Sequence, residues 1–355
     1  MKKQLTIIGP AYGVLTGQSS VTIKVYEILS TLFERVQIVN NNFEGMHQAK
    51  KILYSLLAFA KSLYYLKNTD IFYISIKRGN LSLILDYLII ALIKLRKKKV
   101  IIHLHGNEFF DPNSPAPSIS NSLIKKIFCN SDQIICLNSY QKSHFIKMGH
   151  QNKTRIMPNY FDISNQMYSQ SSIKPSQKNT QIIFLSNFIK EKGFLKFLHL
   201  PELFSHIEFH LCGRILDKNG VESAALDEIL KKKLPNFVYH GFVGPEKKEK
   251  LLTNSGFIFF PSTYATEAQP LSVIEAMSFG CIPIVANRPY ISDIVNSKNG
   301  IILSDNPTLI EIENVIKQLL DFDIESKQKA CIEVSKNFTL QSFSKNLKEL
   351  INDAI

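Results

Sequence analysis

Short apolar runs recur along the chain, and each is followed by a longer segment whose apolar residues repeat with the period of a helix. In the first 160 residues these runs cover 5–9, 35–40, 70–76, 99–106, 133–138 and 153–159. The alternation then restarts, with runs at 180–186, 207–213, 236–242, 256–262, 281–286 and 300–304. Strands that alternate with helices indicate a parallel sheet covered by helices. The pattern therefore predicts two successive α/β domains.

The predicted domains are separated by a polar stretch. Between the two series of runs, the chain becomes rich in Ser, Gln and Asn, a composition typical of a linker. We expect a Rossmann-like domain over 1–165, a linker over 166–180 and a second Rossmann-like domain over 181–337. Residues 338–355 are amphipathic and are expected to form a helix that packs back on the first domain. Ligands should bind at the carboxyl ends of the strands, so the two parallel sheets are expected to face a central cleft.

Two glutamates eight positions apart stand out in residues 267–277, "EAQPLSVIEAM". Pro270 suits the first position of a helix, and Gly280 suits the residue just past its end. Glu267 is therefore expected in a loop, and Glu275 on the second turn of a helix.

The start of that helix is a candidate phosphate site, because the first amides of a helix have no acceptor within it. The amides of Gln269, Leu271 and Ser272 would point out of the helix. A carboxylate would repel a diphosphate, but it can accept the paired hydroxyls of a sugar. In this interpretation Glu267 holds a transferred sugar, Glu275 holds a ribose, and the diphosphate lies between them. The alternative is an exposed loop glutamate and a solvated helix glutamate.

The stretch 267–277 resembles the Glu-x7-Glu motif of retaining GT-B glycosyltransferases of family 4, which build polysaccharides. Its context supports the resemblance: a strand ending in Pro-Ser precedes it, and Gln-Pro-Leu and Glu-Ala-Met accompany the two glutamates. The segments "MPNYFD" (157–162) and "LSNFIKEKGF" (185–194) resemble further parts of the family. The resemblance covers nearly the whole chain and is sharpest over 180–300. It implies a second domain that binds a nucleotide sugar and a first domain that binds the acceptor.

One position departs from the family. Lys192 and Gly193 match the lysine and glycine that bind the donor diphosphate, but Asn187 stands where the family has an arginine. Asparagine cannot offer the charged, bidentate fork of arginine. We expect Lys190 or Arg214 to supply the missing charge.

The resemblance implies donor contacts from both domains. The expected donor-binding residues are Gly17, Asn187, Lys190, Lys192, Gly213, Arg214, Glu267, Ala268, Gln269, Pro270, Leu271, Ser272 and Glu275. Gly17 comes from "GPAYGVLTGQSS" (9–20), which resembles the glycine-rich loop of the family and differs from the Gly-x-Gly-x-x-Gly of nicotinamide enzymes. Catalytic roles are implied for Glu267, Lys192 and His105.

His105 lies in "HLHGNEFF" (103–110), which resembles the His-Gly segment that contacts the transferred sugar. His103 lies on the same strand face, and two such histidines could also suggest a metal. No third ligand has a suitable spacing, so no metal is expected. The Asp-Phe-Asp at 321–323 imitates a metal motif but lies outside a central strand. Acceptor contacts are expected from Arg78, Asn107 and Glu108.

Charge is concentrated in the first domain. The net charge is +12, and residues 1–165 hold 21 Lys and Arg against 9 Asp and Glu, so the whole excess lies there. Residues 50–67 and 81–99 combine aliphatic stretches with lysine clusters, as membrane-surface helices do. They can equally be ordinary sheet-covering helices with lysine-tipped ends. Neither has the roughly 20 uninterrupted apolar residues of a membrane span.

The combined hypothesis is a retaining glycosyltransferase of bacterial surface polysaccharide synthesis, making lipopolysaccharide or capsule. Its donor would be a UDP-sugar, or else a GDP-sugar, with no cofactor, and its acceptor a glycan on a polyprenyl diphosphate. Five widely spaced cysteines indicate a reduced, cytoplasmic protein, expected at the inner face of the cytoplasmic membrane. An oxidoreductase with two Rossmann domains would need the nicotinamide fingerprint, which is absent. A basic membrane- or nucleic-acid-binding protein would explain the charge, but no nucleic-acid reading motif occurs, and no nucleic-acid partner is expected.

Overall fold

The computed structural model describes residues 3–13, 17–43, 45–76, 79–110, 121–161, 179–216 and 220–354. The chain divides into two compact units. Unit 1 comprises Met1–Asn159, Ala265–Gln269 and Phe343–Ile355, and unit 2 comprises Tyr160–Tyr264 and Pro270–Ser342. Most of the predicted linker lies outside the described residues, so its limits stay a prediction.

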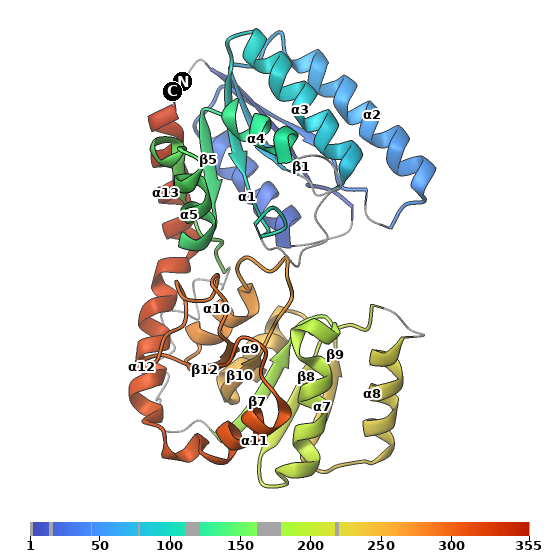
Figure 1. Ribbon diagram of the computed structural model, residues 1–355, viewed down its shortest axis with the longest axis vertical. Coiled ribbons are helices and arrows are strands. Elements are labelled where there is room, and N and C mark those ends of the chain that lie inside the picture. Colours follow the sequence, from blue (N-terminus) through green and yellow to red (C-terminus); the bar gives the residue numbers. More distant parts are fainter. Residues whose placement is uncertain are drawn as a thin grey trace. The chain divides into compact units, whose positions relative to one another are not determined.

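Unit 1 is built on a six-stranded parallel sheet (Figure 1). Its strands are β1 (Gln4–Gly9), β2 (Arg35–Asn40), β3 (Ile71–Ser75), β4 (Lys99–His103), β5 (Gln133–Cys136) and β6 (Thr154–Ile156). Their order across the sheet is β2-β1-β3-β4-β5-β6, and every neighbouring pair is parallel. Five of the six strands fall within a predicted apolar run, and β1 begins one residue before its run. Because all the strands are parallel, their carboxyl ends share one edge, where ligands of open α/β sheets bind.

Helices cover this sheet. They are α1 (Gly17–Ser30), α2 (Gln48–Tyr65), α3 (Asn80–Leu95), α4 (Asn121–Cys129), α5 (Ser139–Lys147) and η1 (Gln151–Lys153), with α13 (Leu340–Ala354) contributing from Phe343 onward. On one face, the strand residues Phe72, Ile102 and Ile134 pack in one core with Ile90 of α3 and Phe128 of α4. Helix α2 lies beside α3 (Figure 1). Unlike α3, it buries only Ser62.

Unit 2 repeats this architecture with a second six-stranded parallel sheet. Its strands are β7 (Asn179–Leu185), β8 (Glu208–Cys212), β9 (Phe237–Gly241), β10 (Ser255–Phe260), β11 (Ile282–Ala286) and β12 (Ile301–Leu303). Their order is β12-β11-β10-β7-β8-β9. Two parallel sheets of this kind confirm the predicted pair of Rossmann-like folds.

The helices of unit 2 cover both faces of its sheet. They are η3 (Lys190–Lys192), α7 (Phe194–Leu203), α8 (Val221–Lys231), α9 (Pro245–Asn254), α10 (Leu271–Ser278), α11 (Leu309–Lys317), η4 (Leu319–Asp321), α12 (Ile324–Ser335) and η5 (Lys336–Phe338). One face is aromatic, with Phe184, Phe209 and Phe259 packed against Phe197 of α7. The other face buries smaller side chains, including Cys212 and, from α10, Ala276.

Helix α10 has well-defined ends. It begins at Leu271, one residue later than predicted, and Pro270 is its N-cap instead of its first helical residue. At its other end, Gly280 has φ +73°, its amide bonds to Met277 O at 2.9 Å, and the amide of Cys281 bonds to Ala276 O at 2.9 Å. This pair of bonds is a Schellman motif, which requires a left-handed residue after the helix and explains the glycine.

The Asp-Phe-Asp sequence near the C-terminus has a structural role. Asp323 is the N-cap of α12, and its side chain accepts a hydrogen bond from the amide of Ser326. Among the described residues, no group of three or more His, Cys, Asp or Glu side chains is placed to hold a metal ion. No helix in the described part of the chain is long and apolar enough to cross a membrane.

Candidate functional site

The carboxyl edge of the unit 2 sheet brings together the loops that follow β7 and β8. The amide of Ser186 bonds to Cys212 O at 3.1 Å, and that of Phe188 bonds to Arg214 O at 2.9 Å. Gly213 has φ +152°, and a Cβ on it would lie 1.8 Å from the carbonyl oxygen of Ser186. Only glycine permits this approach. The backbone therefore brings the Arg214 segment directly beside Asn187.

The side chain of Arg214 stacks on an aromatic ring. Its guanidinium lies 3.8 Å from the centroid of the Phe242 ring, a cation–π distance. Both residues are exposed. Lys190, the other candidate for the missing positive charge, is also exposed, and its backbone amide donates to the Glu222 carboxylate at 3.1 Å. Two exposed cationic side chains, those of Lys190 and Arg214, thus lie on segments close to Asn187.

Lys192 lies beside the loop that leaves β10. Its Nζ is 5.6 Å from the ring centroid of Tyr264 and 5.9 Å from that of Phe260. The following Gly193 has φ +85°, and a Cβ there would lie 2.5 Å from Cγ of Pro261. The amide of Thr263 bonds to Glu191 O at 2.7 Å, which joins the two loops. The matched lysine-glycine pair is therefore packed against the chain that leads into the two-glutamate motif.

Glu275 forms an ion pair that the sequence did not indicate. Both of its carboxylate oxygens accept hydrogen bonds from Lys248 Nζ of α9, each at 2.8 Å. The pair is partly buried, with the two side chains 30% and 20% exposed. Lys248 therefore offsets the negative charge that Glu275 places near the amino end of α10, where anions are favoured.

Glu267, the first glutamate of the motif, belongs to unit 1. The segment Ala265–Gln269 lies in that unit, whereas β10 and α10 on either side of it lie in unit 2. Within unit 1, Asn107 Nδ2 donates to Glu267 O at 2.5 Å, and Asn138 Nδ2 donates to Ala268 O at 2.7 Å. Glu267 itself is partly exposed. The two glutamates of one short motif therefore belong to different units.

A buried histidine lies beside His105. The rings of His103 and His105 have centroids 3.9 Å apart, as expected for two positions on one strand face. Burial lowers the pKa of His103 well below its usual value, and the neighbouring His105 lowers it further. Tyr73 OH lies 2.5 Å from His103 Nδ1, and burial raises the pKa of Tyr73, so the phenol stays protonated. The lowered pKa of His103 keeps its imidazole neutral at neutral pH.

The remaining predicted residues are placed as follows. Asn107 and Glu108 are buried after β4, at the carboxyl edge of the unit 1 sheet, and Gly17 is the first residue of α1. Arg78 lies outside the described residues.

Sequence reasoning missed Lys248, Asn138 and Gln141. Asn138 and Gln141 did carry a signal, because Asn-x-x-Gln is the pattern of a helix capping box. The structure bears this out for the cap: Asn138 Oδ1 accepts from the amide of Gln141 at 2.8 Å. The contact of Asn138 with Ala268, 130 residues further along the chain, has no local signature.

Residues 168–338 match the family profile of the glycosyl transferases group 1. Among curated protein sequences, none matches the chain. Sucrose-phosphate synthase from Thermosynechococcus elongatus is a similar solved structure, with 13% identity, a TM-score of 0.72 and 99% of each chain covered. HepE from Anabaena, in complex with UDP-glucose, has 14% identity, a TM-score of 0.70 and the same coverage.

A third similar structure is the apo form of the lipopolysaccharide outer core galactosyltransferase WaaB. It has 15% identity and a TM-score of 0.67, over 99% of this chain and 100% of WaaB. Identities at this level show a shared fold. The matched domain and the fold together identify the enzyme class as a glycosyltransferase with the GT-B fold.

The neutral His103 predicts how stability depends on pH. Its folded-state pKa is depressed, so below the unfolded value of about 6.5 the unfolded chain binds a proton that the folded chain does not, and stability falls with pH. Between pH 7 and pH 5 this site alone should remove about 2 kcal/mol. In urea unfolding followed by circular dichroism, His103→Gln should show a smaller loss of stability over this range than the unsubstituted protein. His199→Gln, at an exposed histidine, should match the unsubstituted protein. An equal loss in all three would contradict the assignment.

Proposed function

We propose that this enzyme transfers a sugar from a nucleotide sugar to a hydroxyl of a glycan acceptor, with retention of the anomeric configuration, as in family 4. The proposal rests mainly on the position and the ion pair of Glu275. Glu275 sits on the second turn of α10, held by Lys248, eight residues after Glu267 and on a helix whose first amides are available to an anion. A carboxylate held in this way suits the two hydroxyls of a ribose.

The donor is proposed to be a UDP-sugar, with a GDP-sugar as second choice. Support comes from HepE, which shares the fold and whose structure contains UDP-glucose. In the proposed complex, Glu275 accepts from the ribose hydroxyls, and the diphosphate lies against the amides of Leu271 and Ser272. Glu267 and His105 bind the transferred sugar. The positive charge of Lys248 limits the repulsion between Glu275 and the diphosphate.

The reaction breaks the bond between the anomeric carbon and the diphosphate oxygen and forms a bond from that carbon to the acceptor oxygen. Lys192 and the amides at the start of α10 stabilise the negative charge that develops on the leaving diphosphate, which is preorganised electrostatic catalysis. In same-face attack, the leaving phosphate oxygen takes the proton of the acceptor hydroxyl. Arg214 or Lys190 provides the charge that Asn187 lacks, since both are exposed and lie near it.

The proposed donor site predicts different kinetic effects for substitutions at Lys192 and at Lys248. Lys192→Ala should lower kcat by about 100-fold, because its charge acts mainly on the leaving group. Lys248→Met should raise the KM for the donor about fivefold with a smaller change in kcat, because it acts through ground-state binding at Glu275. Initial rates of UDP release over a panel of UDP-sugars and glycan acceptors measure both constants.

Lys250→Met is the matched control, because Lys250 lies on the same helix and is exposed. It should leave both constants unchanged. Full activity in Lys192→Ala together with an unchanged donor KM in Lys248→Met would reject the donor assignment.

The acceptor is proposed to be a glycan carried on a lipid diphosphate and bound by unit 1. Helix α2 has an apolar face that points to solvent, defined here as Ile52, Leu53, Leu56, Leu57, Leu63 and Tyr64. Leu57 and Tyr64 are 54% and 78% exposed. The side of the helix turned toward α3 carries Ser55, Ala58 and Ser62 together with the larger, partly buried Phe59. A helix that leaves most of its larger apolar side chains in solvent is typical of one that lies on a membrane or a partner.

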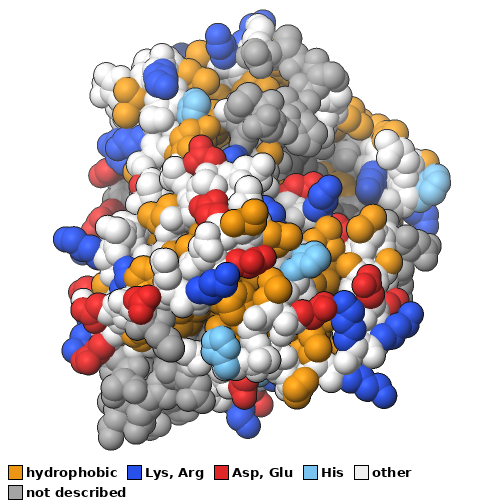
Figure 2. Space-filling view, turned by 60° about the horizontal axis from the view of Figure 1, so that its bottom comes forward, with side chains coloured by type: hydrophobic (Ala, Val, Ile, Leu, Met, Phe, Trp, Pro, Cys, Tyr) orange, Lys and Arg blue, Asp and Glu red, His pale blue; other side chains and the backbone are white. Residues whose placement is uncertain are grey.

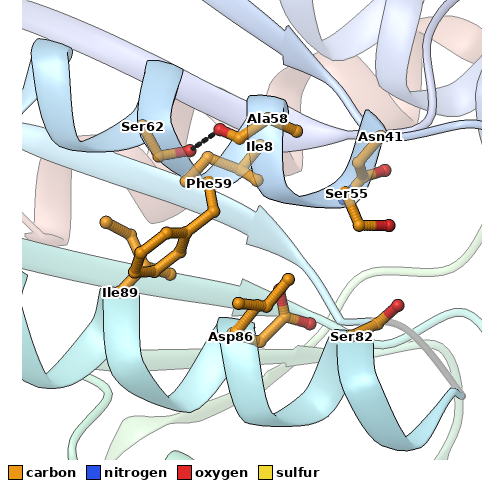
Figure 3. Close-up of a pocket in the computed structure, with 10 residues that line it drawn as sticks. Ile8, Asn41, Ser55, Ala58, Phe59, Ser62, Ser82, Asp86 and Ile89 are labelled. Atoms are coloured by element: carbon orange, nitrogen blue, oxygen red, sulfur yellow. Dashed lines mark hydrogen bonds between the residues drawn. The ribbon is translucent and has the colours of Figure 1, made fainter. Parts of the chain in front are cut away.

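A pocket with a mixed polar and apolar lining lies between α2 and α3 (Figure 3). Its polar residues are Asn41, Ser55, Ser62, Ser82 and Asp86, and its apolar residues come from both helices and from Ile8 of β1. Asn41 directly follows β2, at the carboxyl edge of the sheet, and is buried. A pocket that offers hydrogen-bonding groups beside an exposed apolar face fits an amphiphilic acceptor, with hydroxyls on the pocket side and a lipid on the apolar face.

Charge supports a membrane partner for this half of the chain. The whole excess of positive charge lies in residues 1–165, and Lys50, Lys51 and Lys61 on α2 are exposed beside its apolar face. Such lysines favour an anionic lipid surface. On the face that Figure 2 shows, by contrast, side chains of both signs are intermingled. We therefore propose a cytoplasmic enzyme at the inner face of the cytoplasmic membrane, in surface polysaccharide synthesis.

The membrane proposal is tested by co-sedimentation with vesicles that contain an anionic phospholipid. The unsubstituted protein should bind, and binding should weaken as salt rises. Leu53→Asp/Leu57→Asp should reduce binding at least tenfold, because each leucine loses about 1.5–3 kcal/mol of apolar burial. Leu203→Asp/Leu230→Asp, at exposed leucines of unit 2, is the control and should bind normally. Equal binding of both double variants, or no binding by the unsubstituted protein, would reject the proposal.

A further inference from the structure

The segment Ala265–Gln269, which carries Glu267, is held by a buried polar network. We call this network the polar clamp and define it as Asn107, Asn138 and Gln141. These side chains are 1%, 1% and 0% exposed. They come from two different places in unit 1: the loop after β4, and the end of β5 with the start of α5.

The clamp and its neighbourhood hold four successive residues of the segment, from Thr266 to Gln269. Its bonds to the segment are Asn107 N to Thr266 O at 3.3 Å, Asn107 Nδ2 to Glu267 O at 2.5 Å and Asn138 Nδ2 to Ala268 O at 2.7 Å. The amide of Asn159 then donates to Gln269 Oε1 at 2.6 Å. Thr266, Ala268 and Gln269 are buried. Because buried carbonyls need donors, these bonds fix the register of the segment residue by residue.

Gln141 holds the two asparagines in their rotamers. Its Nε2 donates to Asn107 Oδ1 at 3.0 Å and to Gly106 O at 2.9 Å, and its Oε1 accepts from the amide of Leu137 at 2.7 Å. Its own amide donates to Asn138 Oδ1 at 2.8 Å. Each asparagine oxygen is therefore bound by Gln141, which leaves each Nδ2 directed at the segment. A fully satisfied buried network of this kind is rigid.

We propose that Asn107 and Asn138 are positioning residues for glycosyl transfer, acting by fixing the backbone that presents Glu267 to the sugar. This inference rests on the proposed function. A slip of one residue would place Thr266 or Ala268 where Glu267 should stand, and neither has a carboxylate. Even a 1 Å displacement of a group that orients a substrate can cost about 100-fold in rate. Asn107 was expected on the acceptor side, and its bonds to the segment give it this role instead.

The substitution Asn138→Ser should remove the bond of Asn138 to the segment while keeping its second role as the N-cap of α5. Serine retains an oxygen that can cap α5, because Ser and Asn are comparable N-caps, but it lacks the Nδ2 that holds Ala268 O. The control is Thr308→Ala, which removes the N-cap of α11 and does not touch the clamp. Two readouts are needed: steady-state kinetics, and hydrogen exchange of the peptide that spans residues 264–272, which needs no turnover.

Asn138→Ser should raise exchange in this peptide and lower kcat at least tenfold, with less than a threefold change in the donor KM. Thr308→Ala should change neither. Unchanged exchange in Asn138→Ser would show that the clamp does not hold the segment, and raised exchange with unchanged kcat would show that holding it does not serve transfer. Either result overturns the inference while the proposed function stands. Absence of transfer by the unsubstituted protein, over the full panel of donors, would overturn the proposed function and with it this role.

Discussion

The proposed donor-binding site depends on one constraint, the close approach of backbone segments at the carboxyl edge of the unit 2 sheet. Gly213 passes so near the carbonyl of Ser186 that any side chain would collide with it, and a side chain on Gly193 would collide with Pro261. These contacts bring the loops after β7, β8 and β10 together. Lys192 and the chain that enters α10 are neighbours for this reason. A rigid backbone of this kind is what electrostatic preorganisation requires, because the charges must already be in place when the leaving group departs.

The two glutamates of the motif are held by different means. Glu275 is fixed through its carboxylate by Lys248 of α9, whereas Glu267 is fixed through its backbone by the polar clamp. A carboxylate that is already in an ion pair has a fixed orientation before the nucleotide binds. The clamp bond to Glu267 acts on its backbone carbonyl, so it sets where the residue stands along the segment. The motif of eleven residues thus contains one glutamate whose carboxylate is held by an ion pair and one whose backbone is held by a buried amide.

The strands, the α/β class and the two-glutamate motif could be predicted from the sequence, because hydrophobic periodicity, turn residues and residue spacing are local properties of the chain. The glycine of the Schellman motif, Gly280, and the capping pattern of Asn138 also have local signatures. The Lys248–Glu275 pair and the clamp do not, since they join residues 27 and 130 or more positions apart. The apolar runs of α2 were recognised, but whether they face solvent or cover the sheet was left open. It depends on which side of the helix α3 covers, and tertiary packing decides that.

In the proposed site, α10 and Lys192 bind the diphosphate of a nucleotide whose ribose lies on Glu275. Calorimetric titration with uridine, UMP and UDP measures this binding. Affinity should rise from uridine to UMP and most steeply from UMP to UDP, Lys192→Ala should remove most of this last increase, and 2′-deoxy-UDP should bind more weakly than UDP. Equal affinity for UMP and UDP, or an unchanged increase in Lys192→Ala, would contradict the proposed site.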